Sequence, residues 1–292
     1  MSPSAVLFLA ASVWGIYWLP LRWMEAAGLE GAWAVGIFNL LPVPVLAGWI
    51  VLSGQAHGPW RIAVAVGLLS GGGMGCYALG LVYSGVVRAT MLFYLTPVWG
   101  TLIGILWLGE RVDWSRWSAI GLGLAGLALL LSGGDGVAMP LNAGDALALA
   151  SGVLWAGAAA VIRANPGQPL AAMTMHQFLF AGLTGLGFAV LALGSLTPSG
   201  GAVLRSLPVA ALGSVGMIMP SVLAIFWAQR RVYPGRAGLL MMSEAMVAVV
   251  SATLLLPEEI MAPLQWLGAM LIVGACLVEV LATREAARRA AR

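Results

Sequence analysis

The segment from Phe93 to Trp117 is uncharged along most of its length and strongly charged near its end. No charged residue occurs between Val98 and Leu108, and then four fall within seven positions: Glu110, Arg111, Asp113 and Arg116. An apolar run that ends in charges is typical of a helix leaving a lipid bilayer. The segment therefore predicts a membrane-spanning helix, interrupted by one proline.

The same pattern returns from Ser243 to Trp266, where the apolar run closes on Pro257-Glu258-Glu259. Glu110 and Glu258 are 148 residues apart, which is about half of the 292-residue chain. This spacing predicts that one half of a membrane protein is repeated in the other half.

The composition requires a lipid environment. Only 9% of the residues are charged and 61% are hydrophobic, whereas soluble domains carry about 25% charged residues. We predict an all-α integral membrane protein, because a chain this apolar lacks the polar residues to face water. The ten predicted transmembrane helices lie at about 3–24, 31–53, 60–80, 84–108, 114–133, 142–163, 169–194, 203–228, 235–256 and 262–283.

Matching pairs in the two halves support the repeat. Trp14 precedes Arg22 by eight residues and Trp155 precedes Arg163 by eight, each pair in the first span of its half. Tyr-x-Gly also occurs before the fourth span of each half, at 83–85 and 233–235. Five spans per half is an odd number, so the second copy is inserted upside down, as in secondary transporters with a central cavity. We expect repeats at 1–134 and 142–283, followed by a basic tail at 284–292.

The arginines predict the orientation. With the N-terminus inside, eleven of them fall on the cytoplasmic side and three on the other, which is a positive-inside bias. We expect a multi-pass protein of the cell (inner or plasma) membrane with both termini cytoplasmic and no cleavable signal peptide. The tail either contacts anionic headgroups or is a solvated helix end. The arginines form no single patch, so the basic pI of about 9.2 does not indicate nucleic-acid binding.

These features resemble a known family. A tryptophan in the first span of each half, the Leu95-to-Val98 step (Leu-Thr-Pro-Val) and Gly109-Glu110 are similar to the EamA-type exporters of the drug/metabolite transporter superfamily. The resemblance covers the whole chain and is closest to the amino-acid exporter branch, including exporters of aromatic amino acids. It implies a cavity between spans 1–4 and 6–9, with spans 5 and 10 outside it. The second half departs from the pattern, with Glu244-Ala245 where the first has Thr96-Pro97.

Three polar side chains inside predicted spans are candidates for the substrate cavity. Glu244 lies about nine residues into span nine, where an ionisable group costs roughly 2.5–3.5 kcal/mol and should face the bundle interior. It either binds a substrate amine, carries a proton, or braces helices as a hydrogen-bonded carboxyl. His176 and Gln177 lie in span seven. His176 either takes part in proton coupling or packs between helices.

Prolines and aromatic residues complete the candidate cavity. Pro42, which follows Asn39, and Pro97 break or kink their helices and free backbone carbonyls, either for substrate or as static kinks. Six aromatic residues either form a pocket for an apolar or cationic side chain or pack as core: Trp14, Tyr17, Trp18, Tyr77, Tyr94 and Trp155. Arg88 either snorkels to headgroups or pairs with an acid in an outer gate. The glycine run at 71–75 predicts close helix packing.

The sequence favours a secondary transporter that exports small metabolites, most simply amino acids or related amines, by alternating access. It either lets substrate run down its own gradient or exchanges it for protons. A transporter of another metabolite or anion, such as a nucleotide-sugar, would need several arginines in the cavity. A membrane-embedded enzyme would need a metal or nucleophile motif that the sequence lacks. We predict no cofactor or metal site, with a small-molecule substrate and the lipid bilayer as partners, and the sequence does not indicate the oligomeric state.

Overall fold

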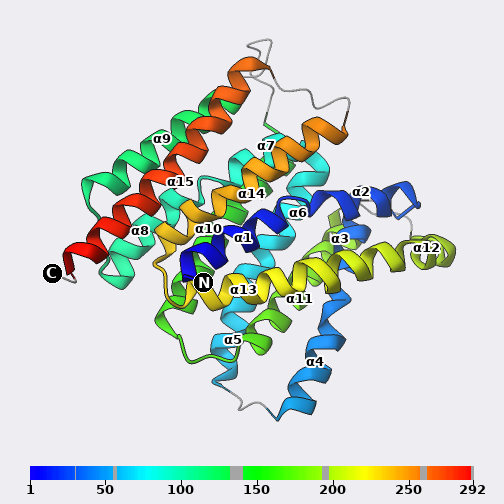
Figure 1. The fold of residues 1–292 in the computed structure, drawn as a ribbon. Helices are drawn as coiled ribbons and strands as arrows, with labels where there is room; N and C mark the ends of the chain where they lie inside the picture. Colours follow the sequence, from blue (N-terminus) through cyan, green and yellow to red (C-terminus); the bar gives the residue numbers. More distant parts are fainter. Residues whose placement is uncertain (30, 55–57, 132–140, 193–196, 257–261, 291–292) are drawn as a thin grey trace.

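The computed structural model describes residues 1–29, 31–54, 58–131, 141–192, 197–256 and 262–290, and these form a helical assembly in which no strand occurs (Figure 1). Glu258 and Glu259, which close the second copy of the opening motif, lie outside the described residues. The helices are α1 (Pro3–Trp14), α2 (Trp18–Ala26), α3 (Gly31–Leu40), α4 (Pro42–Ser53), α5 (Trp60–Val66), η1 (Gly67–Gly71), α6 (Gly72–Ser84), α7 (Val86–Phe93), α8 (Thr96–Leu108), α9 (Trp114–Leu131), α10 (Ala143–Ala164), α11 (Leu170–Gly187), η2 (Phe188–Ala192), α12 (Gly200–Ala211), η3 (Leu212–Ile218), α13 (Met219–Gln229), α14 (Pro234–Leu255) and α15 (Pro263–Ala290).

Each predicted span has a helical counterpart. Seven continuous helical segments in the described part of the chain are long and apolar enough to cross a membrane, and Thr96–Leu108 and Pro263–Ala275 are shorter apolar helices. The protein is therefore a helical membrane protein, and the count of ten transmembrane helices stays a prediction. Leucines and tryptophans such as Leu106 and Trp114 are more than 80% exposed, as expected of an outer surface covered by lipid.

Local sequence sets the helix ends. Ser2 accepts a hydrogen bond from the amide of Ala5 and caps α1, while Asn142 and Asp145 form a reciprocal capping box at the start of α10. Gly109 ends α8 with a φ of 64°, a conformation in which a side chain is strained. These caps satisfy backbone groups at the helix ends that have no partner within the helix.

Prolines divide two of the spans, as the sequence predicted. The helix that begins at Gly31 is broken after Leu40, and α4 starts at Pro42. The span that contains Pro97 is likewise divided between α7 and α8, with Pro97 in the first turn of α8. A proline is tolerated in the first turn because that amide has no helical partner.

The two halves exchange equivalent contacts. In the first half α1 packs against α13 and α14, and in the second half α10, the first helix, packs against α6 and α8. Fourth spans meet as α8 with α14, second spans as α3 with α11, and fifth spans as α9 with α15. Figure 1 shows α9 and α15 side by side at one margin of the molecule. This pair contacts the other helices mainly through α14. The fold therefore has two repeats, with the fifth span of each outside the central group.

Glycines allow this close packing. A methyl group on Gly71 would meet the carbonyl of Gln177, and one on Gly73 would approach the carbonyl of Ser151. These contacts join η1 to α11 and α6 to α10, so the glycine run packs helices as expected. The first helix of each half has a similar contact: Gly15 lies against the carbonyl of Glu244, and Gly152 lies against that of Phe93.

Candidate functional site

Glu244 lies inside the helical group rather than on its surface. Its side chain is 0% exposed, and neither carboxyl oxygen has a hydrogen-bond partner among the residues that the structure describes. The hydroxyls of Tyr77 and Tyr94 are close enough to interact with it. Because an unpaired charge is costly in such surroundings, the carboxyl needs either a proton or a cationic ligand.

The two tyrosine hydroxyls are held by other groups. The Tyr94 hydroxyl donates to the carbonyl oxygen of Met241 at 2.7 Å, and the Tyr77 hydroxyl shares a hydrogen bond with Thr90 Oγ1 at 3.0 Å. Both tyrosines are fully buried. They therefore present a fixed polar edge beside Glu244 without neutralising it.

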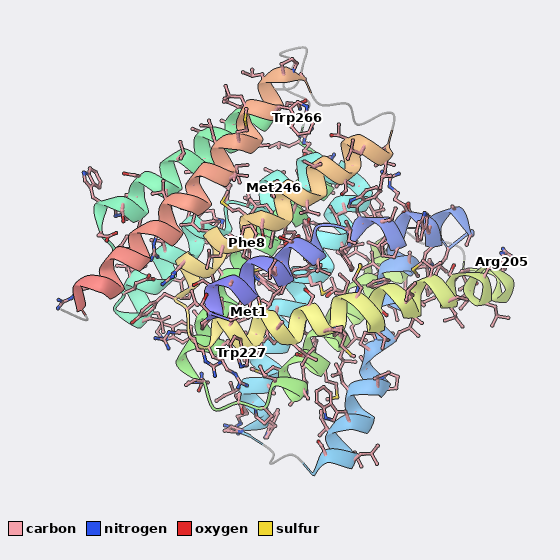
Figure 2. The ribbon with its side chains drawn as sticks, viewed as in Figure 1. Met1, Phe8, Arg205, Trp227, Met246 and Trp266 are labelled. Atoms are coloured by element: carbon pink, nitrogen blue, oxygen red, sulfur yellow. The ribbon has the colours of Figure 1, made fainter. Side chains whose placement is uncertain are left out.

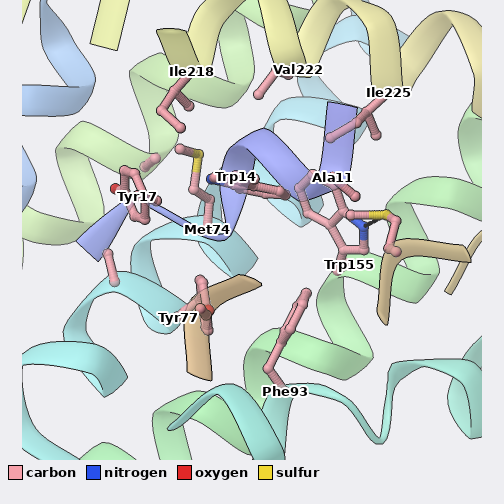
Figure 3. Close-up of a cluster of buried hydrophobic side chains, with 14 of the residues drawn as sticks. Ala11, Trp14, Tyr17, Met74, Tyr77, Phe93, Trp155, Ile218, Val222 and Ile225 are labelled. Carbon is pink, nitrogen blue, oxygen red and sulfur yellow. Dashed lines mark hydrogen bonds between the residues drawn. The ribbon is translucent and has the colours of Figure 1, made fainter. Parts of the chain in front are cut away.

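Aromatic rings from both halves meet next to this carboxyl, and Figure 3 shows several of them with Met74 and the α13 face. We call them the aromatic cluster: Trp14, Tyr17, Phe38, Tyr77, Phe93, Tyr94, Trp155 and Phe226. At its centre the rings of Trp14 and Trp155, the matching tryptophans of the two halves, lie 4.9 Å apart. The cluster is packed shut, since neither tryptophan is more than 2% exposed.

The broken second span contributes a buried amide to the cluster. Asn39 Nδ2 donates to the Tyr17 hydroxyl at 3.1 Å and to the carbonyl of Val35 at 2.9 Å. Asn39 Oδ1 has no hydrogen-bond partner in the described structure. Pro42, which begins α4, lies one turn further along and is also buried. An acceptor oxygen is thus available to a ligand at this side of the cluster.

Other predicted residues lie at the edge of the cluster. Trp18 Nε1 donates to Ser251 Oγ at 3.0 Å on α14, and Trp155 Nε1 lies 3.4 Å from Met241 Sδ. Pro97 packs where Gly238 lets α8 and α14 approach closely. These contacts join the two fourth spans to the first span of each half.

His176 and Gln177 are neighbours in sequence but point to different places. Gln177 is fully buried, and its Nε2 lies 3.1 Å from Sδ of Met74, which packs beside Trp14. His176 instead lines a separate cavity of about 310 Å³ between α4, α5 and α11, with Trp60 and Gln168. The structure therefore brings Gln177 to the cluster and places His176 apart from it.

Each end of the molecule has a contact between matching positions of the two halves. Arg88 and Arg236 stand eight residues before Thr96 and Glu244, while Ser4 and Asp145 stand ten before Trp14 and Trp155. At one end Arg88 forms an ion pair with Asp145 at 2.7 Å. At the other, which we call the N-terminal end, Arg236 donates to Ser4 Oγ at 3.0 Å. The acid partner considered for Arg88 from the sequence is thus Asp145.

A second set of contacts joins loops at the N-terminal end. We call it the arginine network: Arg163, Arg230, Gln168 and Pro59. From the sequence, Arg163 was a repeat marker, and both Arg163 and Arg230 counted among the eleven cytoplasmic arginines. Neither was predicted to lie at the site. The spacing of eight residues between Trp155 and Arg163 was the signal that could have indicated that Arg163 lies near the site.

A helical membrane protein with two repeats around a buried polar and aromatic centre has the architecture of a small-molecule transporter. The sequence profile of the EamA-like transporter family matches this chain twice, at residues 2–132 and 142–281. The chain therefore belongs to the EamA-like transporter family, and the resemblance to that family is confirmed. The amino-acid exporter branch within it stays a prediction.

Similar proteins support this class. A riboflavin transporter of Rhizobium johnstonii is 27% identical over 187 residues, which is 63% of this chain and 59% of that protein. A protein of Vibrio cholerae described as an uncharacterized transporter is 29% identical over 130 residues, or 42% of this chain and 43% of that one. A crystal structure of a protein with 20% sequence identity shares the fold, with a TM-score of 0.73 over 96% of this chain and 98% of the other.

Proposed function

We propose that this protein exports amino acids with apolar or aromatic side chains, or related amines, by alternating access. The observation that carries the proposal is Glu244, a buried carboxyl beside an aromatic cluster, to which the described residues supply no hydrogen bond. A substrate ammonium group would neutralise Glu244, and the substrate side chain would lie among the rings, where cations and apolar groups are both favoured.

The transport cycle follows from the two repeats. The halves, at 1–134 and 142–283 with the tail at 284–292, rock about the cluster so that it opens to one end at a time. With both termini cytoplasmic, the N-terminal end faces the cytoplasm. When no substrate is bound, a proton on Glu244 would replace the ammonium group, and this exchange would couple export to the proton gradient.

A second substrate class has one observation in its favour. The relative from Rhizobium johnstonii is named a riboflavin transporter. The rings of Trp14 and Trp155 would accommodate a planar heterocycle by stacking. Such a substrate, like an anionic metabolite, has no ammonium group for Glu244, so the geometry favours the amine-bearing substrate.

The test is transport by the purified protein in liposomes. Vesicles loaded with labelled phenylalanine, tryptophan, leucine, tryptamine or riboflavin are followed for release with and without a pH gradient. We expect saturable release of the amino acids or the amine, faster when protons can be exchanged. Release of riboflavin alone, from protein shown to be folded and inserted, would refute the amino-acid proposal and support the second class.

Orientation is tested separately. Tags at the two termini should be inaccessible to a membrane-impermeant probe in intact cells and become accessible once the membrane is permeabilised. Labelling of either tag in intact cells would contradict the proposed topology. Labelling of both tags would mean that the N-terminal end faces outward, so the proposed direction of export would be wrong.

A further inference from the structure

Two arginines at the N-terminal end, Arg163 and Arg230, donate only to backbone carbonyls among the residues that the structure describes. Arg163 Nη1 donates to the carbonyl oxygen of Arg230 at 3.1 Å, and Arg230 Nη2 donates to that of Gln168. Gln168 Nε2 in turn donates to the carbonyl oxygen of Pro59 at 2.7 Å. The network thereby joins the loops between spans 2 and 3, spans 6 and 7, and spans 8 and 9.

The charge of these arginines is not balanced. No carboxylate pairs with Arg163 or Arg230 within the described ranges, and the Nε–H of each is buried without an acceptor. The Arg163 guanidinium instead lies 4.7 Å from the ring centre of Tyr233. Burial, and secondarily the charge of Arg231, lower the pKa of Arg230. A guanidinium binds carboxylates bidentately and more strongly than it binds carbonyls, so an anion would be a better partner than those present.

The network lies directly beneath the aromatic cluster. Arg163 is eight residues beyond Trp155 on α10, a distance of about 12 Å along a helix. Gln229, immediately before Arg230, is buried, and its Nε2 lies 3.8 Å from Sδ of Met241, which also contacts Trp155. Gln229 Oε1 has no hydrogen-bond partner in the described structure. Polar groups therefore continue from the network to the cluster.

The equivalent position in the other half differs. Arg22 follows Trp14 by the same eight residues, but its side chain is exposed at the opposite end. Symmetry of the fold alone does not explain a half-buried arginine at 163. Its environment is specific to the N-terminal end.

We propose that Arg163 and Arg230 recognise the carboxylate of the transported amino acid at the N-terminal end, before its ammonium group reaches Glu244. The inference rests on the proposed function, because it names the second charged group of the same substrate. The carboxylate replaces the carbonyl oxygens of Arg230 and Gln168 as the partner of the two guanidiniums. Those carbonyls are then released, the three loops separate, and the substrate moves past Gln229 into the cluster.

The experiment compares a substrate pair that differs only in the carboxylate. Transport of tryptophan and of tryptamine, its decarboxylated amine, is measured in proteoliposomes with substrate supplied at the N-terminal end. Arg163→Gln and Arg230→Gln should each raise the KM for tryptophan at least tenfold and leave that for tryptamine within about twofold. Arg163→Lys, which keeps the charge but loses the planar fork, should give an intermediate KM.

Arg231→Gln is the matched control. Arg231 is exposed, and its guanidinium lies 4.3 Å from the ring centre of Trp227 and donates to the Trp227 carbonyl at 2.8 Å. Its KM for both substrates should be unchanged. A melting temperature for each variant shows that it is folded, and Arg163→Lys keeps the test valid if a glutamine variant does not fold.

The outcomes separate this inference from the proposed function. Equal changes in both KM values would mean that the arginines only hold the loops together, and the inference would be wrong. KM values that do not change in the variants would also overturn the inference. So would a wild-type protein that transports tryptamine but not tryptophan. Both results would leave the amine site at Glu244 intact. If the folded wild type moves neither substrate, the proposed function fails and this inference fails with it.

Discussion

The two halves of the chain place the same contacts at matching positions, but two of those positions hold different residues and a third holds the same residue in a different environment. Thr96 in α8 corresponds to Glu244 in α14, Ser4 corresponds to Asp145, and exposed Arg22 corresponds to half-buried Arg163. The Thr96 hydroxyl donates to the carbonyl of Phe93 across the break between α7 and α8, whereas the Glu244 carboxyl has no hydrogen-bond partner in the described structure. The shared residues build the fold, and the differing ones give it a direction and a charged centre.

Glu244→Gln should have the largest effect. An amide of the same size cannot neutralise an ammonium group or exchange a proton, so we expect transport to fall about a hundredfold or more. Thr96→Val is the matched change in the other half and should reduce transport less than about threefold, because that hydroxyl is satisfied locally. Initial rates per folded molecule in proteoliposomes give both numbers. Near-wild-type transport by Glu244→Gln would remove this residue from the mechanism.

The same comparison shows what the sequence could predict. The spans, the repeat and the breaks at Pro42 and Pro97 follow from hydropathy and proline chemistry, which act locally. Glu244 was identifiable because an ionisable residue inside an apolar run is rare. The sequence did not predict that Arg88 pairs with Asp145 or that His176 lies apart from the cluster. Both features depend on which helix faces lie together. Periodicity does not specify these long-range contacts.

Glycine substitutions compare the close packing of the first span in the two halves, although Gly15 and Gly152 are not at matching positions. A methyl group at Gly15 would meet the Glu244 carbonyl, and one at Gly152 would meet the Phe93 carbonyl. Gly15→Ala and Gly152→Ala should each destabilise the protein by about 1–3 kcal/mol, because helices at close approach must separate. Thermal unfolding in detergent should show similar losses. Transport per folded molecule should fall further in Gly15→Ala, which displaces Glu244, and equal transport losses would argue against a special role for the second half.

Exchanging Ser4 and Asp145 tests the two ends. Asp145→Ser would leave a neutral contact where the Arg88 ion pair now holds that end, and Ser4→Asp would give Arg236 an acid. We expect Asp145→Ser to favour opening of the end that the Arg88 ion pair holds by about 1–3 kcal/mol. Ser4→Asp should favour closure of the N-terminal end by a smaller amount. An impermeant thiol reagent and a cysteine introduced at Tyr83 into a cysteine-free background measure the opening. An unchanged labelling rate in Asp145→Ser would show that this ion pair does not control access.

The smallest effect concerns the starts of the two outer spans. Asp113 accepts hydrogen bonds from Ser115 Oγ at 2.8 Å and from the Arg116 amide at 3.3 Å, whereas Gln265 Oε1 accepts from the Ala262 amide at the start of α15. The Ser115 hydroxyl, more than any other group, lowers the pKa of Asp113. A lowered pKa adds stability above the pKa of the unfolded chain, near 4, and this is lost as pH falls through the folded value.

Asp113→Asn keeps a capping side chain but cannot titrate. The stability of the variant should therefore equal that of the wild type at pH 3. At pH 6 the variant should be less stable by less than about 1 kcal/mol, because the Asp113 side chain is largely exposed. Melting temperatures of both proteins across this pH range give the difference in stability. Because the other carboxyls titrate in both proteins, their contribution is removed from this difference. Gln265→Glu places a titratable group at the start of α15 and should introduce a pH dependence there. If the difference in stability between wild type and Asp113→Asn does not change with pH, the charge of this carboxylate does not stabilise the fifth span.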